Sequence, residues 1–312
     1  MAVAFRDLFG RRDTAGGAAI AAQVTGLAQG WSIEITARQA AKLERLPLPR
    51  GTRVNIAYLP DEEPSAILQT AARLVFEGMV PVPHVPARTL PSATALSTYL
   101  HGLAAVGVRE ALVIGGGVAD QQGPFASSMD VLKTGLFGEL GFSRVAVAGH
   151  PEGSPDISAQ GLAAALAEKN EWARTAGLEV ELMTQFCFDA GKVARWEQAI
   201  RTAGNRLPIR VGLPGPASIK SLLRYAQMCG VGNSLSFLSK RGGNVLQLVT
   251  ATEPDGFIVD LARNLGNDPG HLVAGLHFYP FGGFEKTVNY AGAVAAGRFA
   301  VEGDGQGFSL TA

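Results

Sequence analysis

The chain carries one acid and one amide at positions where a parallel fold holds its ligands. Glu34 lies between Ile33 and Ile35 in a short apolar segment, and Gln185 follows an apolar run that begins at Leu178. A carboxylate between isoleucines is costly to bury unless it is paired or solvated. Burial raises the pKa of such a group, so it can hold a proton near neutral pH and act as a general acid.

Other candidates for chemistry also stand at the ends of apolar runs. They are Ala57, Tyr58, His84, Gly115, Gly116, Gly117, His150, His277 and Tyr279. The triple glycine can form a plain turn, or it can let a flat ligand approach the backbone closely. The histidines form no HxH or HxxxH pair, so we predict no metal site.

Eight short runs, mostly apolar, alternate with helical patterns, and they are expected to position these side chains. The expected strands are Ser32–Thr36, Arg53–Tyr58, Val80–Val85, Ala111–Ile114, Arg144–Ala148, the run from Leu178 towards Gln185, Ile209–Leu213 and Leu272–Phe278. The expected helices are Gly17–Leu27, Ala37–Leu46, Pro64–Glu77, Ser92–Ala105, Ser127–Leu140, Ser158–Thr175, Lys192–Ala203, Ala217–Cys229, Gly256–Asn264 and Lys286–Ala296.

These runs do not alternate strictly between apolar and polar residues, which is typical of parallel strands covered by helices. Eight such units predict an α/β fold, a (β/α)8 TIM barrel. No GxGxxG follows the first strand, which weighs against an open doubly wound sheet. We expect residues 1–30 to be a helical lead-in outside the barrel, residues 31–300 the barrel, and residues 301–312 a C-terminal tail.

Composition narrows the class of protein. The 312 residues are 47% hydrophobic, and 27 basic residues balance 27 acidic ones, so no net field attracts nucleic acid. The two cysteines, Cys187 and Cys229, suit a reducing compartment. Residues 1–12 lack the apolar core of a signal peptide, and no apolar stretch is long enough for a membrane span. We therefore expect a cytoplasmic protein, and a homo-oligomer remains open.

Several motifs, in order and in register with the eight units, together resemble methylenetetrahydrofolate reductase over about residues 32–280. They are Glu34, Pro83-His84, Pro151-Glu152, Thr184-Gln185-Phe186-Cys187-Phe188-Asp189, Gly212-Leu213-Pro214-Gly215, Tyr225-Ala226-Gln227-Met228-Cys229 and His277-Phe278-Tyr279. That family is a (β/α)8 barrel that holds FAD at its strand ends. It passes hydride from a nicotinamide, through the flavin, to the methylene group of 5,10-methylenetetrahydrofolate.

The resemblance implies a role for each matching position. Glu34 would be the general acid that helps to open the folate ring, and Gln185 would contact the pterin. Tyr225, His277 and Tyr279 would lie at the substrate. The cofactor positions implied by the resemblance are Ala57, Tyr58, His84, Gly115, Gly116, Gly117, His150 and Lys169.

Departures from the family pattern fall mainly on the flavin side. Gly117 stands where the family has an aspartate beside the flavin, Ala57 replaces a threonine and His150 replaces a tyrosine. Loss of a carboxylate near the flavin should stabilise the anionic reduced form and raise its reduction potential. The resemblance therefore implies a divergent member, suited to oxidising 5-methyl- to 5,10-methylenetetrahydrofolate.

The sequence leaves several functions open. NADH and NADPH are both compatible with it. Hydride can pass directly from the nicotinamide to folate in the same barrel, without flavin. A folate-dependent methyltransferase and a non-catalytic folate-binding subunit are the alternatives from other classes.

Overall fold

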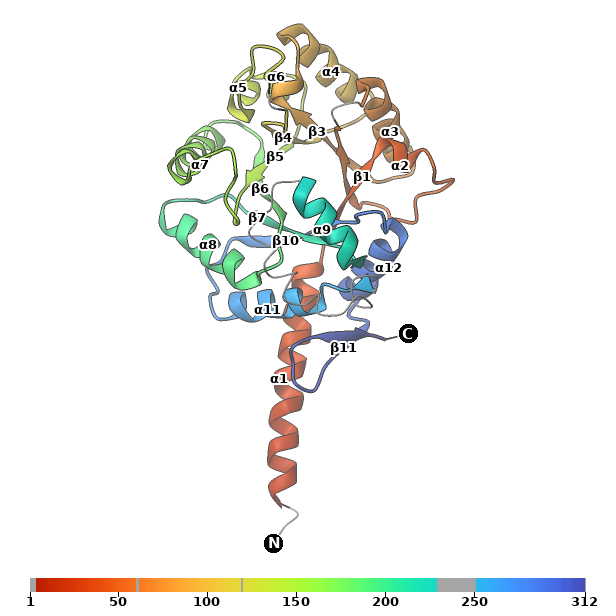
Figure 1. The fold of residues 1–312 in the computed structure, drawn as a ribbon, viewed down its shortest axis with the longest axis vertical. Coiled ribbons are helices and arrows are strands. Elements are labelled where there is room, and N and C mark those ends of the chain that lie inside the picture. The colour runs from red at the N-terminus through yellow and green to blue at the C-terminus, as the bar shows by residue number, and fades with distance from the viewer. Residues whose placement is uncertain (1–3, 60–61, 119, 229–250, 312) are drawn as a thin grey trace.

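The short apolar runs pair as parallel strands and close into a barrel (Figure 1). The computed structural model describes residues 4–59, 62–118, 120–228 and 251–311. The barrel strands are β1 (Ser32–Thr36), β2 (Arg53–Ala57), β3 (Val80–Pro86), β4 (Glu110–Ile114), β5 (Arg144–Gly149), β6 (Glu179–Phe186), β7 (Ile209–Pro214) and β10 (Val273–Tyr279). Each expected strand becomes one of these, and the predicted (β/α)8 barrel is confirmed.

Helices surround the barrel, and the long helix α1 precedes the first strand and extends beyond the barrel (Figure 1). They are α1 (Ala4–Ala28), α2 (Ala37–Ala40), α3 (Pro64–Phe76), α4 (Ala93–Ala105), α5 (Ser128–Leu132), α6 (Leu136–Glu139), α7 (Ala159–Ala173), α8 (Ala190–Thr202), α9 (Ile219–Met228), α11 (Asp255–Gly266) and α12 (Phe284–Ala295), with a 3-10 turn at Ala87–Thr89. Side chains of Ser92, Ser158 and Asp189 accept bonds from backbone N–H groups in the first turns of α4, α7 and α8. These caps explain why the helices begin close to the predicted residues.

Two predicted helices are shorter than expected. The helix expected over 127–140 breaks into α5 and α6, because Gly135 takes a left-handed conformation with φ of 80°. The helix expected over 37–46 ends at Ala40. The Arg73 guanidinium donates to the carbonyls of Ala40 and Glu44, at 2.7 and 3.0 Å. These two carbonyls therefore have hydrogen-bond partners without a continuing helix.

The carboxyl-terminal part of α1 packs on the barrel, while its amino-terminal part projects away from it (Figure 1). Val24 and Ala28 of α1 are fully buried in the main core. The C-terminal residues form a hairpin of β11 (Phe299–Val301) and β12 (Phe308–Leu310). Apolar side chains on both segments explain the packing, since leaving them in water would forgo their burial energy.

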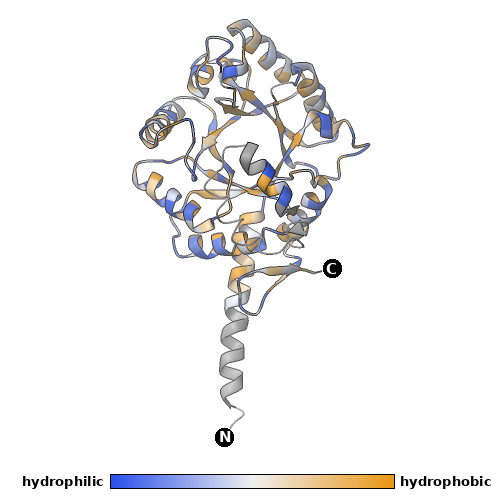
Figure 2. Cartoon of the chain, in the orientation of Figure 1, coloured by the Kyte–Doolittle hydropathy of each residue, from blue (hydrophilic) through white to orange (hydrophobic). Residues whose placement is uncertain are grey.

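Apolar side chains fill the layer between strands and helices, and a smaller cluster lies inside the barrel. Figure 2 shows the strands as the mainly hydrophobic centre of the fold. The inner cluster consists of Val82, Leu112, Ala146 and Met183, with Ile114 beside it. It fills one part of the barrel interior, and polar side chains fill the rest.

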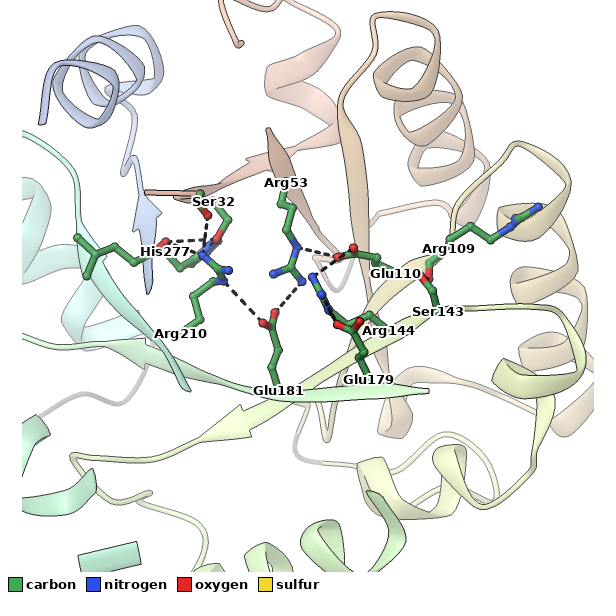
Figure 3. Close-up of polar contacts among 12 residues, drawn as sticks. Ser32, Arg53, Arg109, Glu110, Ser143, Arg144, Glu179, Glu181, Arg210 and His277 are labelled. Atoms are coloured by element: carbon green, nitrogen blue, oxygen red, sulfur yellow. Dashed lines mark hydrogen bonds and ion pairs between the residues drawn. The ribbon is translucent and has the colours of Figure 1, made fainter. Parts of the chain in front are cut away.

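The amino ends of the strands enclose a network of charged side chains, which we call the ion network (Figure 3). Its members are Arg53, Glu110, Arg144, Glu179, Glu181 and Arg210. Arg53 lies 2.7 Å from Glu110 and 2.6 Å from Glu181, and Arg210 approaches Glu181 to 3.8 Å. Burial alone would raise the pKa of Glu181, but Arg53, Arg210 and Arg144 hold it below its usual value.

Glu181→Gln should destabilise the fold strongly. The change keeps the side-chain shape but leaves Arg53 and Arg210 without their shared buried counter-charge, which typically costs about 3–5 kcal/mol. Chemical unfolding at neutral pH measures this. The matched control is Glu171→Gln in the exposed pair with Arg174, which should cost less than about 1 kcal/mol. Equal losses in the two variants would contradict the importance of the ion network.

Candidate active site at the barrel mouth

The parallel barrel brings the carboxyl ends of its strands together at one end, which we call the mouth. Glu34 on β1, His84 on β3 and Gln185 on β6 lie near the ends of their strands, and His150 follows β5 directly. Tyr279 is the last residue of β10. Glu34, His84, His150 and Gln185 therefore lie toward the same end of the barrel.

Glu34 and His84 form a close pair inside the mouth. His84 Nε2 lies 3.5 Å from Glu34 Oε2, and their side chains are only 10% and 23% exposed. Burial raises the pKa of Glu34 to about 7 and lowers the pKa of His84 to about 4. Between these values the pair is electrically neutral and holds one acidic proton.

Local structure fixes both members of this pair. Thr36 ends β1 with a capping box in which its side chain and that of Gln39 bond each other's backbone N–H groups. The hydroxyl of Tyr99 on α4 donates to the carbonyl of His84 at 3.2 Å. Hydrogen bonds therefore fix the backbone of β1 two residues after Glu34 and the backbone of β3 at His84.

Gln185 lies at the carboxyl end of β6, one residue before the last residue of the strand. The register of β6 against β7 shifts between Met183 and Phe186, and the hydroxyl of Thr184 fills the irregularity by accepting from the N–H of Gly212 at 2.8 Å. Thr184 and Phe186, on either side of Gln185, are buried. The amide of Gln185 reaches the loop after β5 and donates to the carbonyl of Gly153 at 3.4 Å.

Aromatic side chains line one side of the mouth, and we call them the aromatic wall: Phe186, Tyr279 and Phe281. The ring centroids of Phe186 lie 5.7 Å from Tyr279 and 4.9 Å from Phe281, and Tyr279 stacks on Phe281. The Tyr279 hydroxyl donates to the carbonyl of Thr184 at 3.0 Å. A Cβ at Gly212 would lie 2.7 Å from the Tyr279 ring, so this crossing requires glycine.

Phe281 was not predicted from sequence, and its backbone marks it out. Its φ of 46° is the only positive value at a non-glycine position among the described residues. Such a conformation costs of the order of 1–3 kcal/mol and is often kept where a side chain must be aimed. Here it turns an aromatic ring against Phe186 and Tyr279.

His277 lies deeper than the mouth position expected for a substrate contact. It stands two residues before the end of β10, is fully buried, and shares a hydrogen bond of 2.9 Å between its Nδ1 and the Ser32 hydroxyl (Figure 3). Burial, then the charges of Arg210, His84 and Arg53, lower its pKa well below the usual value. It is therefore a neutral imidazole inside the barrel, below Tyr279.

The positions implied for flavin do not form the expected cradle. Lys169 is buried, and its ammonium donates to the carbonyl of Ala148 at 2.9 Å. His84 faces Glu34, and the ring of Tyr58 packs edge-on against Tyr99. Burial and then the charge of Lys169 lower the pKa of His150 to about 4, so that ring is neutral.

There is open space beside the backbone at Gly115 and Gly117. A Cβ at Gly115 or Gly117 would meet no atom within 4 Å, and Gly116 has a φ of 91°. Ala57 is buried and offers no polar atom. The described residues therefore do not fit FAD in the manner of the resembled family, and we derive no chemical step through flavin.

The remaining candidates carry less. Tyr225 belongs to α9, which packs Leu222 against Phe186 beside the mouth, but the Tyr225 side chain lies outside the described residues. Cys187 is fully buried, and burial raises its pKa, so it is a poor nucleophile. Cys229 also lies outside the described residues. Among those described, no three acidic, histidine or cysteine side chains gather to hold a metal ion.

Sequence reasoning missed the polar residues inside the barrel. They are Ser32, Arg53, Asn55, Glu181 and Arg210, all at least nine-tenths buried. The available signal was a spacing of two between polar residues within the strands, as in Ser32 and Glu34 or Arg53 and Asn55. Because residues two apart face the same side of a strand, this spacing indicates a polar barrel interior.

Comparison with known proteins supports the fold and no narrower family. No family model matches the sequence. An uncharacterized protein from Clostridium thermocellum that binds two copies of 5-methyl-5,6,7,8-tetrahydrofolic acid is 12% identical, with 85% of this chain and 94% of that chain covered and a TM-score of 0.55. A putative phosphonomutase from Burkholderia cenocepacia is 10% identical, with coverage of 91% and 99% and a TM-score of 0.47.

None of the described helices combines the length and apolar character needed to cross a bilayer.

The raised pKa of Glu34 predicts an unusual pH dependence of stability. The folded state holds this proton more tightly than the unfolded state, so the wild type loses stability as pH rises from about 4.5 to about 7. The Glu34→Gln variant has no carboxyl at this position, so its stability does not fall in this pH range for this reason. Relative to wild type, its free energy of unfolding should therefore improve by about 2–3 kcal/mol between pH 5 and pH 8.

Denaturant unfolding at both pH values measures this change, with Glu171→Gln as a surface control whose difference from wild type should stay constant. A difference between Glu34→Gln and wild type that is the same at both pH values would contradict a raised pKa.

Proposed function

We propose that this protein binds a tetrahydrofolate at the barrel mouth and interconverts its 5,10-methylene and 5-methyl forms, with a nicotinamide as hydride partner. The observation that carries the proposal is the buried Glu34 carboxyl, which is paired with His84 and has a pKa of about 7. A group with this pKa can both give and take a proton near neutral pH. Opening the methylene bridge needs such a proton at the departing nitrogen.

The surroundings of Glu34 suit a flat, polar heterocycle. Ser32 pairs with His277 in the register of β1 and β10, so Glu34 and Tyr279 stand at the same level, two residues further on. The aromatic wall begins at that level and offers a surface on which a pterin ring can stack. Gln185 supplies an amide that can both donate to and accept from the polar edge of the ring.

Glu34, the aromatic wall and Gln185 have different roles in the reaction. In the reductive direction, Glu34 gives its proton to the departing nitrogen while the carbon–nitrogen bond breaks. Hydride from the reduced nicotinamide forms the new carbon–hydrogen bond and leaves a methyl group. The aromatic wall and Gln185 hold the ring during this step, and the low exposure of Glu34 and His84 limits the access of water to the acid.

A neighbouring structure supports the choice of ligand. The Clostridium thermocellum barrel binds 5-methyltetrahydrofolate, and this chain shares its fold over 85% of its length. At 12% identity the likeness carries no residue roles. It shows that a barrel of this shape can hold a reduced folate, which the chemistry of the mouth suggests independently.

Direct transfer of hydride from nicotinamide to folate is the form of the reaction that the described residues favour. Lys169 and His84 are engaged within the protein, at the backbone and at Glu34 respectively. The absorption spectrum of purified protein tests this: flavin bands at a substantial fraction of the protein concentration would restore FAD as the carrier. The oxidative preference inferred from Gly117 depends on flavin and would be restored with it.

A second candidate function is folate binding without hydride transfer, as in a methyltransferase or a carrier subunit. The same neighbour favours it, because what is stated for that protein is binding alone. Oxidation of NADH or NADPH that depends on methylenetetrahydrofolate would separate the two functions. Tight binding of 5-methyltetrahydrofolate without any such oxidation would support the second candidate.

Glu34→Gln should abolish most turnover in this assay. The amide keeps the shape of the side chain but has no acidic proton, and positioned acid catalysis is worth about 10²–10⁴-fold. The nicotinamide and folate affinities should stay close to wild type. Turnover within a few-fold of wild type would remove Glu34 as the acid.

Gln185→Leu should weaken binding of 5-methyltetrahydrofolate. Loss of a hydrogen bond to a buried polar partner costs about 1–3 kcal/mol, which corresponds to roughly ten- to a hundredfold in the dissociation constant. Calorimetric titration measures it, with Met183→Leu in the apolar part of the barrel as the matched control. Equal affinities for the two variants would exclude Gln185 from the pterin site.

A further inference from the structure

Unpartnered polar atoms are concentrated inside the barrel. Eight buried side-chain atoms among the described residues have no hydrogen-bond partner, and six of these belong to inward-facing strand residues. The six are Nη1 of Arg53, Nδ2 and Oδ1 of Asn55, Nε2 of His84, Nε of Arg210 and Nε2 of His277. Buried polar groups are normally satisfied, so such a cluster indicates a local function or bound water.

These atoms form a column from the mouth to the ion network. Asn55 pairs with Glu34 in the register of β1 and β2, and Arg53 precedes it by two residues on the same side of β2. His84 stands one step nearer the mouth on β3, and His277 is level with Ser32 and Arg53. Asn55, which is fully buried, is therefore level with Glu34, one step below His84 and one step above His277.

The column reaches solvent at the far end. Arg210 and Arg53 approach Glu181 from two sides, and Arg53 also bonds Glu110 (Figure 3). Arg144 joins Glu110 to Glu179, whose side chain is 70% exposed. Guanidinium groups do not release protons, so the carboxylates and histidines are the members that can exchange them.

We propose that Glu34, His84, Asn55, His277 and the carboxylates of the ion network, bridged by ordered water, form a proton relay that reloads Glu34 from the barrel end opposite the mouth. Asn55 is a positioning residue, because its amide can donate to one water and accept from another. The six unpartnered atoms supply the two to four partners that each buried water needs.

The relay completes the proton balance of the proposed function, on which its catalytic role rests. Each reduction moves one proton from Glu34 to the departing nitrogen and one hydride to the methylene carbon, so Glu34 ends as a carboxylate. It must regain one proton from solvent while folate and nicotinamide cover the mouth. The relay passes that proton through His84, which faces Glu34 at 3.5 Å.

Several polar and charged groups lie close enough to Glu34 and His84 to influence their titration with pH. His84 on β3 and Asn55 on β2 are nearest to Glu34, and His277 on β10 lies below with Arg53 and Arg210 beyond it. The first test uses the free protein. Ring nitrogen shifts of His84 and His277, labelled with ¹⁵N, are followed with pH and assigned with His84→Gln and His277→Gln.

In the wild type both histidines should respond at the midpoint of Glu34, and in Asn55→Leu the response of His277 should disappear while that of His84 remains. Asn55→Ser keeps a hydroxyl and space for water, and it should restore the response. Met183→Leu, elsewhere in the barrel interior, should leave both responses unchanged. A response of His277 that survives in Asn55→Leu would be through-space electrostatics and would overturn the relay, as would no response in the wild type.

The second test uses turnover. After rapid mixing with methylenetetrahydrofolate and reduced nicotinamide, Asn55→Leu should complete its first turnover at the wild-type rate and then slow by about tenfold or more, since reloading is impaired but the first proton is present. Equal slowing of the first and later turnovers would indicate a structural role and overturn the relay. If no variant turns folate over, the proposed function fails, and the titration of the free protein still decides the relay.

Discussion

Removal of the Glu34 carboxyl from water is the constraint on which the chemistry of this protein depends. A carboxyl in water is ionised at neutral pH, and only burial moves its pKa to about 7. The barrel achieves this because β1 carries Glu34 inward between the neighbouring strands β2 and β10. His84, held neutral by the same burial, gives the acid a partner without giving it a counter-charge that would ionise it.

The electrostatic environment differs between the two ends of the barrel. At the amino ends, three arginines and three glutamates neutralise one another, and Glu181 stays ionised despite its burial. At the mouth, no comparable cation approaches Glu34 among the described residues, so the acid keeps its proton. A buried ion pair adds little net stability, but loss of one partner is strongly destabilising. The ion network therefore favours the strand arrangement that keeps every charged side chain paired.

Much of this fold could be predicted, because the strands are short apolar runs and the helices begin at serine, aspartate and proline residues that cap or start them. The placement of Glu34, His84 and Gln185 at one end followed from parallel pairing alone. The contact between Glu34 and His84 did not, because β1 and β3 are separated by β2 and the sequence gives no measure of how side chains meet across a barrel.

Other features were hidden for different physical reasons. The ion network was missed because Arg53 and Glu181 are polar residues within apolar strands, and their pairing links positions 128 residues apart in the chain. The strained backbone of Phe281 depends on tertiary packing against Phe186, which no local pattern records. The flavin positions implied by the family resemblance follow from residue types, whereas the Lys169 side chain donates to a backbone carbonyl and the His84 side chain faces Glu34.

The central claim is that Glu34 carries a proton at neutral pH. Infrared difference spectroscopy of the free protein, titrated with pH and compared with Glu34→Gln, measures this directly through the carbonyl stretch of the protonated carboxyl. The account predicts a band that disappears with a midpoint at about pH 7 and is absent from Glu34→Gln. Loss of the wild-type band near the ordinary carboxyl pKa, about 4.3, would contradict it.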